Sequence, residues 1–192
     1  MKIDKIINFF FEIASLRRLT RSHRQVIQEV SDNISDHSFR VAVIGMILAE
    51  LEGADQNKVL KMALFHDIPE ARTGDANFVN KMYADLKEEE AIIDQMDGLP
   101  IAKDVLEISE EFLQRKTKEA IVAKDADLLD QMILNQEHFF KDEKNRKLWQ
   151  WNSSRNLKTE SAKKIAQKIQ ETNPLEWVYK IAEDKKGMKI NR

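Results

Sequence analysis

Residues 62–75 read MALFHDIPEARTGD, and this stretch carries most of what the chain says about its fold and function. An apolar run, Met62 to Phe65, leads directly to His66 and Asp67. Pro69 follows, and proline ends a helix because it lacks the N–H and clashes with the preceding turn. Neighbouring side chains inside a helix point about 100° apart, whereas at a helix end they can converge. We therefore expect His66 and Asp67 at or near a helix C-terminus.

A neutral imidazole beside a carboxylate is a ligand pair that suits Zn, Mn, Fe, Co or Ni. Glu70, Arg72 and Asp75 follow within the same stretch and offer groups for acid–base chemistry and anion binding. The alternative is a surface helix end with scattered charges, because His-Asp dipeptides are common. The apolar residues before the pair favour the functional interpretation, since unpaired buried charge is costly.

The composition of the chain limits the classes of protein to which it can belong. A chain of 192 residues predicts one domain with one sizeable core. A net charge of −2 gives no reason to expect binding to nucleic acid or to a membrane. Cysteine is absent, so any metal site must use carboxylates and the 4 histidines. Polar residues interrupt the apolar N-terminus, and no stretch reaches the ~20 apolar residues of a membrane span, so we expect a cytoplasmic protein.

The chain predicts an all-α fold, because only 5 Gly and 3 Pro interrupt a sequence rich in helix-forming residues. We expect one helical domain over 1–184 and a frayed tail over 185–192. The residues around Trp149 and Trp151 are expected to form a loop. The expected helices are 3–17, a helix from Ser35 or Asp36 to Leu51, 56–67, 76–96, 101–115, 118–141, 160–172 and 174–184.

Two further residues are candidates, although neither is decisive by itself. His37 lies in the first turn of an apolar helix, where a histidine more often caps or packs than binds metal. Asp127 lies in a helix with an apolar face, yet three of its four helical neighbours are polar. Asp127 is therefore either a site residue or a solvated residue at the rim of the core.

The order of these residues resembles the HD phosphohydrolase superfamily. The metal ligands of that family are a histidine, then an adjacent His-Asp pair, then a distant aspartate. This sequence has the same order in His37, His66-Asp67 and Asp127, the last within KDADLL. The segments DHSFRVA at 36–42 and ALFHDIPEARTGD at 63–75 resemble its 5′-deoxynucleotidase branch. The resemblance covers about residues 15–140 and implies a helical bundle of the HD type that binds one divalent metal ion.

The resemblance also implies the role of each residue. It assigns metal binding to His37, His66, Asp67 and Asp127, and catalysis to Glu70 and Asp75. Asp125 is the alternative to Asp127, which is preferred because the family's aspartate follows Ala and precedes x-Leu. The implied metal is Mn, Co, Zn, Ni, Fe or Mg.

A basic segment precedes the first motif and holds Arg17, Arg18, Arg21 and Arg24. It is either a solvated face or a site for phosphate, whose shape a guanidinium matches well. In the branch named above, an arginine before the first motif contacts phosphate. Arg21 is the best match, Arg18 is second, and Arg72 is a further candidate.

One departure from the branch concerns the sugar. Relatives carry a tryptophan after this arginine that helps to select deoxyribose, whereas Ser22 and His23 follow Arg21 here. Sugar preference therefore stays open, and His23 is either a substrate contact or a surface residue. Trp149, Trp151 and Trp177 are interpreted as anchors of the C-terminal helices or as part of a subunit interface.

The resemblance implies an enzyme that releases phosphate from (deoxy)nucleoside 5′-monophosphates by attack of a metal-activated water. The family commonly forms homodimers. The alternatives are another HD-type phosphodiesterase or nucleotide hydrolase, a non-catalytic nucleotide sensor, and a helical scaffold that binds no metal.

Overall fold

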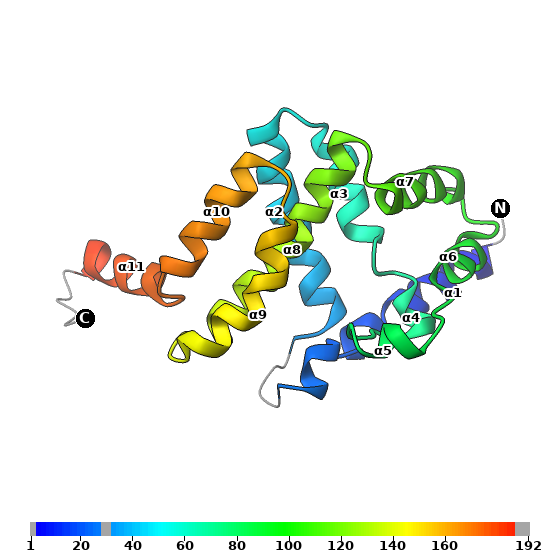
Figure 1. Cartoon of the computed structure of the whole chain (residues 1–192). Coiled ribbons are helices and arrows are strands. Elements are labelled where there is room, and N and C mark those ends of the chain that lie inside the picture. The colour runs from blue at the N-terminus through cyan, green and yellow to red at the C-terminus, as the bar shows by residue number, and fades with distance from the viewer. Residues whose placement is uncertain (1–2, 28–31, 187–192) are drawn as a thin grey trace.

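The computed structural model describes residues 3–27 and 32–186, and every regular element in these two ranges is a helix (Figure 1). The predicted all-α fold is confirmed. The α-helices are α1 (Ile3–Ile13), α2 (Ile34–Glu52), α3 (Gln56–Phe65), α4 (Glu70–Thr73), α5 (Asn80–Tyr83), α6 (Glu88–Met96), α7 (Ala102–Gln114), α8 (Lys118–His138), α9 (Glu143–Asn156), α10 (Glu160–Glu171) and α11 (Glu176–Lys186). Two 3₁₀ helices, η1 (Leu16–Arg18) and η2 (Ser22–Gln25), lie between α1 and α2.

Helices α2, α3 and α8 pack together at the centre, with α7 on one side and α9 and α10 on the other (Figure 1). The main core includes Val41, Leu48, Val59 and Leu129, all buried. Gly45 allows α2 to approach α3 closely, because a Cβ atom there would lie 3.0 Å from Cγ1 of Val59. This close packing holds the first turn of α2 near the end of α3 and the middle of α8.

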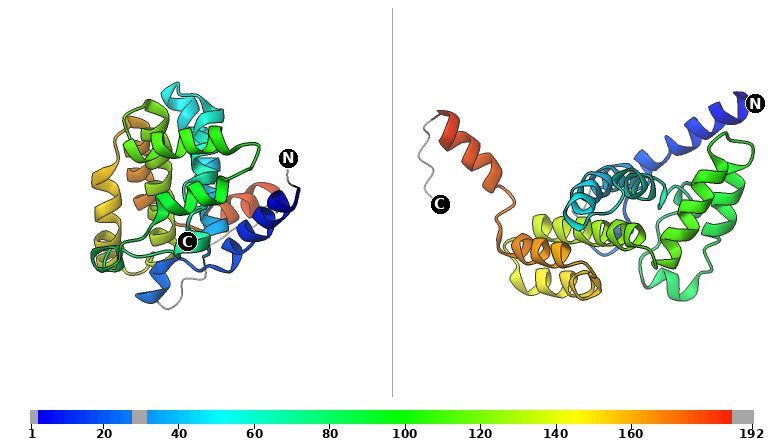
Figure 2. Two further views of the ribbon diagram at one scale, coloured as in Figure 1. Left: turned by 90° about the vertical axis from the view of Figure 1, so that its right-hand side faces the viewer. Right: turned by 90° about the horizontal axis from the view of Figure 1, so that it is seen from above.

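A second, smaller core joins α1 to α6, α7 and the segment after α3. Its buried members include Phe9, Ile34, Ile68 and Met96. Helix α1 extends beyond this core, and α11 projects from the other end of the molecule toward the same side (Figure 2). No helix of the described residues is long and apolar enough to cross a lipid bilayer.

Two predicted segments were wrong. The expected loop around Trp149 and Trp151 is the interior of α9, which the side chain of Asp142 caps by accepting a hydrogen bond from the N–H of Asn145. The expected single helix over 76–96 is broken into α5 and α6 by an irregular stretch at 84–87.

The observed helix ends agree more closely with the predicted ones. Thr117 caps α8, and Gly53, with φ of 63°, ends α2, both as expected. The N-cap of α2 is Asn33, two residues before the earlier of the two candidates. Helix α1 ends at Ile13 instead of 17, and α8 ends at His138 instead of 141. Helix α11 continues to Lys186, so residues 185–186 of the expected tail are helical, while 187–192 lie outside the described residues.

Candidate metal centre

Three helices deliver the side chains of the candidate metal centre. Helix α3 ends at Phe65, and His66 and Asp67 lie in the turn between α3 and α4, as the proline after them predicted. His37 comes from the first turns of α2, and Asp127 from the middle of α8. The four residues that the sequence assigned to metal binding therefore meet at one place.

The potential ligand atoms are closely spaced. Nε2 of His37 lies 3.3 Å from Nε2 of His66, from Oδ2 of Asp67 and from Oδ1 of Asp127. Oδ2 of Asp67 is also 3.3 Å from Nε2 of His66. One ligand atom each from His37, His66 and Asp127 fall within 4.8 Å of one another. Two ligand atoms bound to one ion at ~2.1 Å and at tetrahedral or octahedral angles are about 3.0–3.4 Å apart, so this spacing fits one bound cation.

Hydrogen bonds on the far side of each imidazole set the protonation of the ring. Nδ1 of His66 donates to the carbonyl oxygen of Ala63 at 2.8 Å, and Nδ1 of His37 donates to Oδ2 of Asp130 at 2.7 Å. Because each Nδ1 carries a proton, each neutral ring presents the Nε2 lone pair to the centre. Two lone pairs 3.3 Å apart repel each other unless a cation or a proton lies between them. The donor set thus fits a divalent metal ion.

The electrostatic surroundings keep both carboxylates ionised. Burial favours the protonated form of a carboxylate, but His66 and His37 outweigh it and hold the pKa of Asp67 below its usual value. Lys124 and His37 do the same for the pKa of Asp127. Burial lowers the pKa of His66, whereas hydrogen bonds to Asp127, Asp130 and Asp67 outweigh burial and raise the pKa of His37. Metal binding must therefore compete with a proton at His37.

Asp130 and Arg40 form a supporting layer that the sequence analysis did not identify. Oδ1 of Asp130 accepts a hydrogen bond from Nε of Arg40 at 2.5 Å, and Nη2 of Arg40 bonds Asp32 at 2.9 Å. Both residues could have been predicted from helical spacing. Asp130 lies three residues after Asp127 on α8, and Arg40 lies three residues after His37 on α2, so each shares a helix face with a proposed ligand. Such partners hold ligating histidines in one orientation.

Arg21 is buried beside the cluster. Its Nη1 lies 3.3 Å from Oδ2 of Asp67, and its Nε lies 3.7 Å from Oδ2 of Asp75. Asp75 in turn accepts hydrogen bonds from the N–H and the hydroxyl of Ser22, at 2.7 and 3.1 Å. Asp75 therefore connects the segment that carries Arg21 to the loop after α4.

Glu70 opens α4 and is 6% exposed. Its Oε2 is buried and has no hydrogen-bond partner among the described residues. Burial, together with the charges of Asp67 and Asp75, raises the pKa of Glu70 to about 9. The site thus contains a carboxyl group that holds a proton near neutral pH and has a free oxygen.

Three other residues that the sequence analysis named as candidates for metal or phosphate binding lie outside the cluster. Both oxygens of Asp125 serve the start of α10, where Oδ2 accepts from the N–H of Thr159 at 2.7 Å. Nε and Nη2 of Arg72 donate hydrogen bonds to the two carboxylate oxygens of Glu12 on α1, and Arg18 is exposed in η1. Among the described residues, Arg72 and Arg18 make no hydrogen bond or ion pair with the cluster. The structure thus places Asp125, the alternative to Asp127, and Arg72, the further candidate for phosphate binding, in contacts outside the cluster.

His23 is half-buried, so the interpretation as a plain surface histidine was wrong. The centroids of its ring and of the Trp149 ring lie 6.1 Å apart with the two ring planes at 66°, and Trp149 stacks on Phe139. Burial and the charge of Arg21 lower the pKa of His23 to about 4, so the ring is neutral at pH 7. Its Nδ1 is buried without a partner in the described part of the chain.

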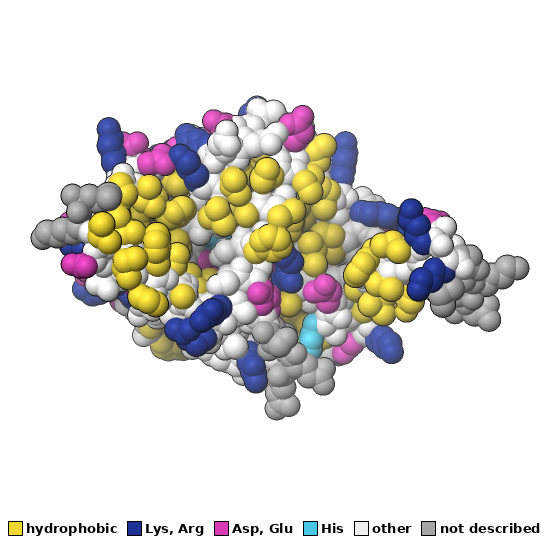
Figure 3. All heavy atoms as spheres, turned by 180° about the vertical axis from the view of Figure 1, so that it is seen from behind, with side chains coloured by type: hydrophobic (Ala, Val, Ile, Leu, Met, Phe, Trp, Pro, Cys, Tyr) yellow, Lys and Arg dark blue, Asp and Glu magenta, His cyan; other side chains and the backbone are white. Residues whose placement is uncertain are grey.

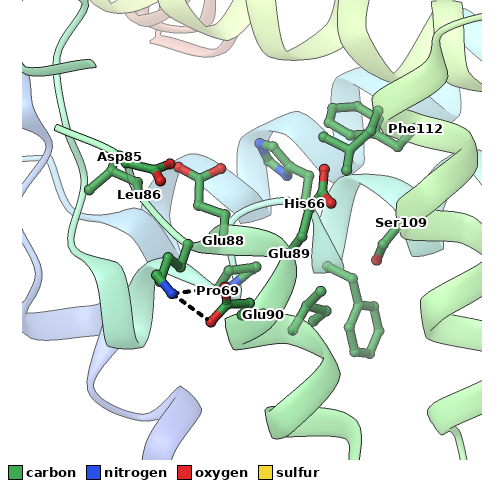
Figure 4. Close-up of a pocket in the computed structure, with 13 residues that line it drawn as sticks. His66, Pro69, Asp85, Leu86, Glu88, Glu89, Glu90, Ser109 and Phe112 are labelled. Atoms are coloured by element: carbon green, nitrogen blue, oxygen red, sulfur yellow. Dashed lines mark hydrogen bonds and ion pairs between the residues drawn. The ribbon is translucent and has the colours of Figure 1, made fainter. Parts of the chain in front are cut away.

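A pocket of about 430 Å³ adjoins the cluster at His66 (Figure 4). The segment that leads into α6 and the start of α6 form one wall, and α7 forms the other with Ser109 and Phe112. Four carboxylates line the first wall, and among the described residues that line it Lys87 is the one cation, which pairs with Glu90. These carboxylates belong to Asp85, Glu88, Glu89 and Glu90.

A family model described as HD domain matches residues 13–173. The chain is 33% identical over 117 residues to a protein of Dictyostelium discoideum named 5′-deoxynucleotidase HDDC2, a match that covers 55% of this chain and 62% of that protein. The human protein of the same name is 26% identical over 141 residues and is matched over 68% of its length. A conserved hypothetical protein from Pyrococcus furiosus superposes with a TM-score of 0.71 at 28% identity, covering 86% of this chain and 99% of that one.

Proposed function

We propose that this chain, which belongs to the HD domain family, is a metal-dependent phosphohydrolase acting on (deoxy)nucleoside 5′-monophosphates. The convergence of two imidazole nitrogens and two carboxylates at spacings of 3.3 Å is the observation that carries this proposal. The substrate class is supported by relatives named 5′-deoxynucleotidase. We further propose a homodimer and a cytoplasmic location.

His37, His66, Asp67 and Asp127 would hold the metal. A divalent cation bound there supplies an acidified water molecule and neutralises charge on the phosphoryl group. Asp130 and Ala63 hold the two imidazoles through their Nδ1 atoms, so both Nε2 atoms would be available to a bound cation. Imidazole and carboxylate ligands suit Mn, Fe, Co, Ni or Zn, whereas Mg prefers oxygen ligands alone.

Arg21 would bind the phosphate. Its buried guanidinium is held by two carboxylates and needs little reorganisation to meet a third anion. A guanidinium can also form two parallel hydrogen bonds to a phosphate group. In this proposal Asp75 positions Arg21 through the bonds to Ser22, in addition to the catalytic role that the resemblance implies.

Glu70 would handle protons. Its free Oε2 and raised pKa suit a group that orients the attacking water and exchanges a proton with it. The carboxyl group can also pass a proton toward the leaving 5′-oxygen, a role that the sequence resemblance allows for Asp75 as well.

The pocket beside His66 would hold the nucleoside. Its four carboxylates repel a phosphate group, so the phosphate lies on the side of Arg21 and the uncharged part of the substrate in the pocket. Carboxylates accept hydrogen bonds from the amino groups of bases, and Phe112 offers an apolar surface.

Phosphate release from a panel of ribo- and deoxyribonucleoside 5′-monophosphates tests the proposal. Metal-stripped protein is assayed with Mn, Co, Mg, Zn or Ni added back, and Asp67→Ala is the control. Metal-dependent release that the control lacks supports the proposal. Folded, metal-loaded protein that releases no phosphate from any monophosphate refutes it and directs the search to diesters, triphosphates or a nucleotide sensor.

A further inference from the structure

The pocket beside His66 combines an apolar interior with a few polar groups, as sites for small molecules usually do. Leu86, Ile92 and Phe112 supply apolar surface, and the last two are themselves buried. The volume of about 430 Å³ lies within the usual range of about 300–1,000 Å³ for ligand pockets. The polar groups on its walls therefore decide which ligand is preferred.

Two of the four carboxylates on the α6 side of the pocket are already engaged. Glu90 and Glu88 each accept a hydrogen bond from a lysine, at 2.9 and 3.4 Å. The side chains of Asp85 and Glu89 make no hydrogen bond or ion pair with another described residue. An ionised carboxylate accepts hydrogen bonds and donates none. The pocket thus contains two acceptors that are open to a ligand.

Helix α7 contributes a hydroxyl group to the other side of the pocket (Figure 4). Oγ of Ser109 is buried and has no hydrogen-bond partner among the described residues. Ser109 and Phe112 are three positions apart and share one side of α7. A buried hydroxyl without a partner is costly, and a ligand that bonds to it removes that cost. This group can donate or accept, unlike the carboxylates.

The gathering of acidic residues at this pocket is local. On the face seen in Figure 3, by contrast, Asp and Glu side chains are scattered among Lys and Arg, and hydrophobic side chains gather instead. Acidic residues in a first turn stabilise a helix, which accounts for the glutamates of α6 but not for Asp85, which precedes that helix. Together these carboxylates favour the positive end of a ligand's dipole.

The bases of nucleotides differ in what they present to such acceptors. Cytosine has an amino group and a ring nitrogen with a lone pair where uracil has a carbonyl oxygen and an N–H. A carboxylate accepts a hydrogen bond from the amino group, but it meets the carbonyl oxygen with no proton between the two acceptors. Adenine and hypoxanthine differ in the same way.

We propose that the pocket prefers bases that carry an exocyclic amino group, namely cytosine, adenine and guanine, over uracil, thymine and hypoxanthine, which carry none. Asp85 and Glu89 supply the acceptors, and Ser109 bonds the ring nitrogen. Phe112 packs against the ring. This inference rests on the proposed function, because it takes the nucleoside of a monophosphate to lie in the pocket.

Rates on matched pairs of substrates test the preference. With the sugar that the enzyme accepts, the metal-loaded full chain should give a kcat/KM for cytosine monophosphate about tenfold above that for uracil monophosphate. The adenine and hypoxanthine monophosphates should differ by a similar factor. Contacts to phosphate, sugar and metal cancel in each ratio, because the members of a pair differ only in the base. Equal values within both pairs, or the reverse preference, would overturn the inference.

Three variants test the assigned contacts. Glu89→Gln and Asp85→Asn each introduce an amide that can donate, at exposed positions, so each should lower the cytosine-to-uracil ratio about 2–10-fold. Ser109→Ala should lower kcat/KM for both bases, because a hydroxyl serves either the ring nitrogen or its N–H. Glu107→Gln makes the same change on α7 outside the pocket and should leave every rate unchanged.

A ratio that the double variant of Asp85 and Glu89 keeps, or rates that Ser109→Ala leaves unchanged, would contradict the assigned contacts. Calorimetric titration of the metal-loaded Glu70→Gln variant with both pyrimidine monophosphates then separates this inference from the proposed reaction. Tighter binding of the cytosine compound by a chain that releases no phosphate would refute the reaction and support the pocket assignment. Phosphate release from every monophosphate, with equal affinities, would do the reverse.

Discussion

Nδ1 of His37 lies 2.7 Å from Oδ2 of Asp130, and this contact reaches from the first turns of α2 to α8 in the centre of the fold. Asp130 is itself held by Arg40. The orientation of one proposed metal ligand thus depends on two residues that cannot reach the metal.

Asp130→Asn should therefore lower the affinity for metal while the four proposed ligands stay in place. Loss of a partner that orients a ligating histidine typically costs about 10–100-fold in metal affinity. Calorimetric titration of the metal-stripped protein with Mn²⁺ measures the change. The control is Asp94→Asn at an exposed position, which should bind like the wild type. Equal affinity of all three proteins would contradict the supporting role of Asp130.

Arg21→Lys should raise KM for nucleoside monophosphates by about 10–100-fold, because one charge-assisted contact to phosphate is worth roughly 1.5–3 kcal/mol. Lysine keeps the positive charge between Asp67 and Asp75, so the fold is retained. Steady-state kinetics on the loaded enzyme provide the measurement. Arg72→Lys is matched to it and should leave KM unchanged, because Arg72 bonds Glu12. The opposite pattern would assign phosphate binding to Arg72.

Asp125→Asn and Asp127→Asn should behave differently. Asp125 accepts hydrogen bonds at the start of α10, so its loss should cost about 2 kcal/mol of unfolding free energy. That cost corresponds to a melting temperature lower by about 4–8 °C, with metal content unchanged. Asp127→Asn should instead reduce the metal content. Thermal denaturation and metal analysis separate the two, and metal loss in Asp125→Asn alone would reverse the assignment.

The metal-free protein should become less stable, relative to Glu70→Gln, as the pH rises from about 5 to about 9. The pKa of Glu70 is raised to about 9 in the folded state, so the folded state binds a proton that the unfolded state has already released. Stability from a raised carboxyl pKa is present at low pH and is lost as the pH approaches the folded pKa. Urea unfolding of both proteins in a chelating buffer measures the difference, and a difference independent of pH would exclude this titration.

The candidate site was largely predictable, because its residues follow one another in a diagnostic order. Pro69 placed His66 and Asp67 at a helix end, where the structure has them. The polar neighbours of Asp127 had left it open whether that residue faces water. One of them, Asp130, is in fact buried against His37, which only the packing of α2 on α8 reveals.

Helix α9 shows where local sequence failed. Its tryptophans and the polar segment after them suggested a loop, but tertiary contacts stabilise the helix. Gln150 is buried and donates to the carbonyl oxygen of Met132 on α8, and Trp149 stacks on Phe139. The capping residue Asp142 was a readable signal of the helix start, whereas these long-range contacts were not.

The hydrogen bonds from Ser22 to Asp75 also have a mechanical consequence. They fasten the 3₁₀ turn that follows Arg21 to the loop after α4, two segments that are 53 positions apart in the chain. Neither segment can shift by more than a fraction of an ångström unless the other shifts with it or both bonds break. In the proposed reaction, departure of the product phosphate from Arg21 would therefore be coupled to movement of that loop, and the turnover rate would fall when either segment is made stiffer.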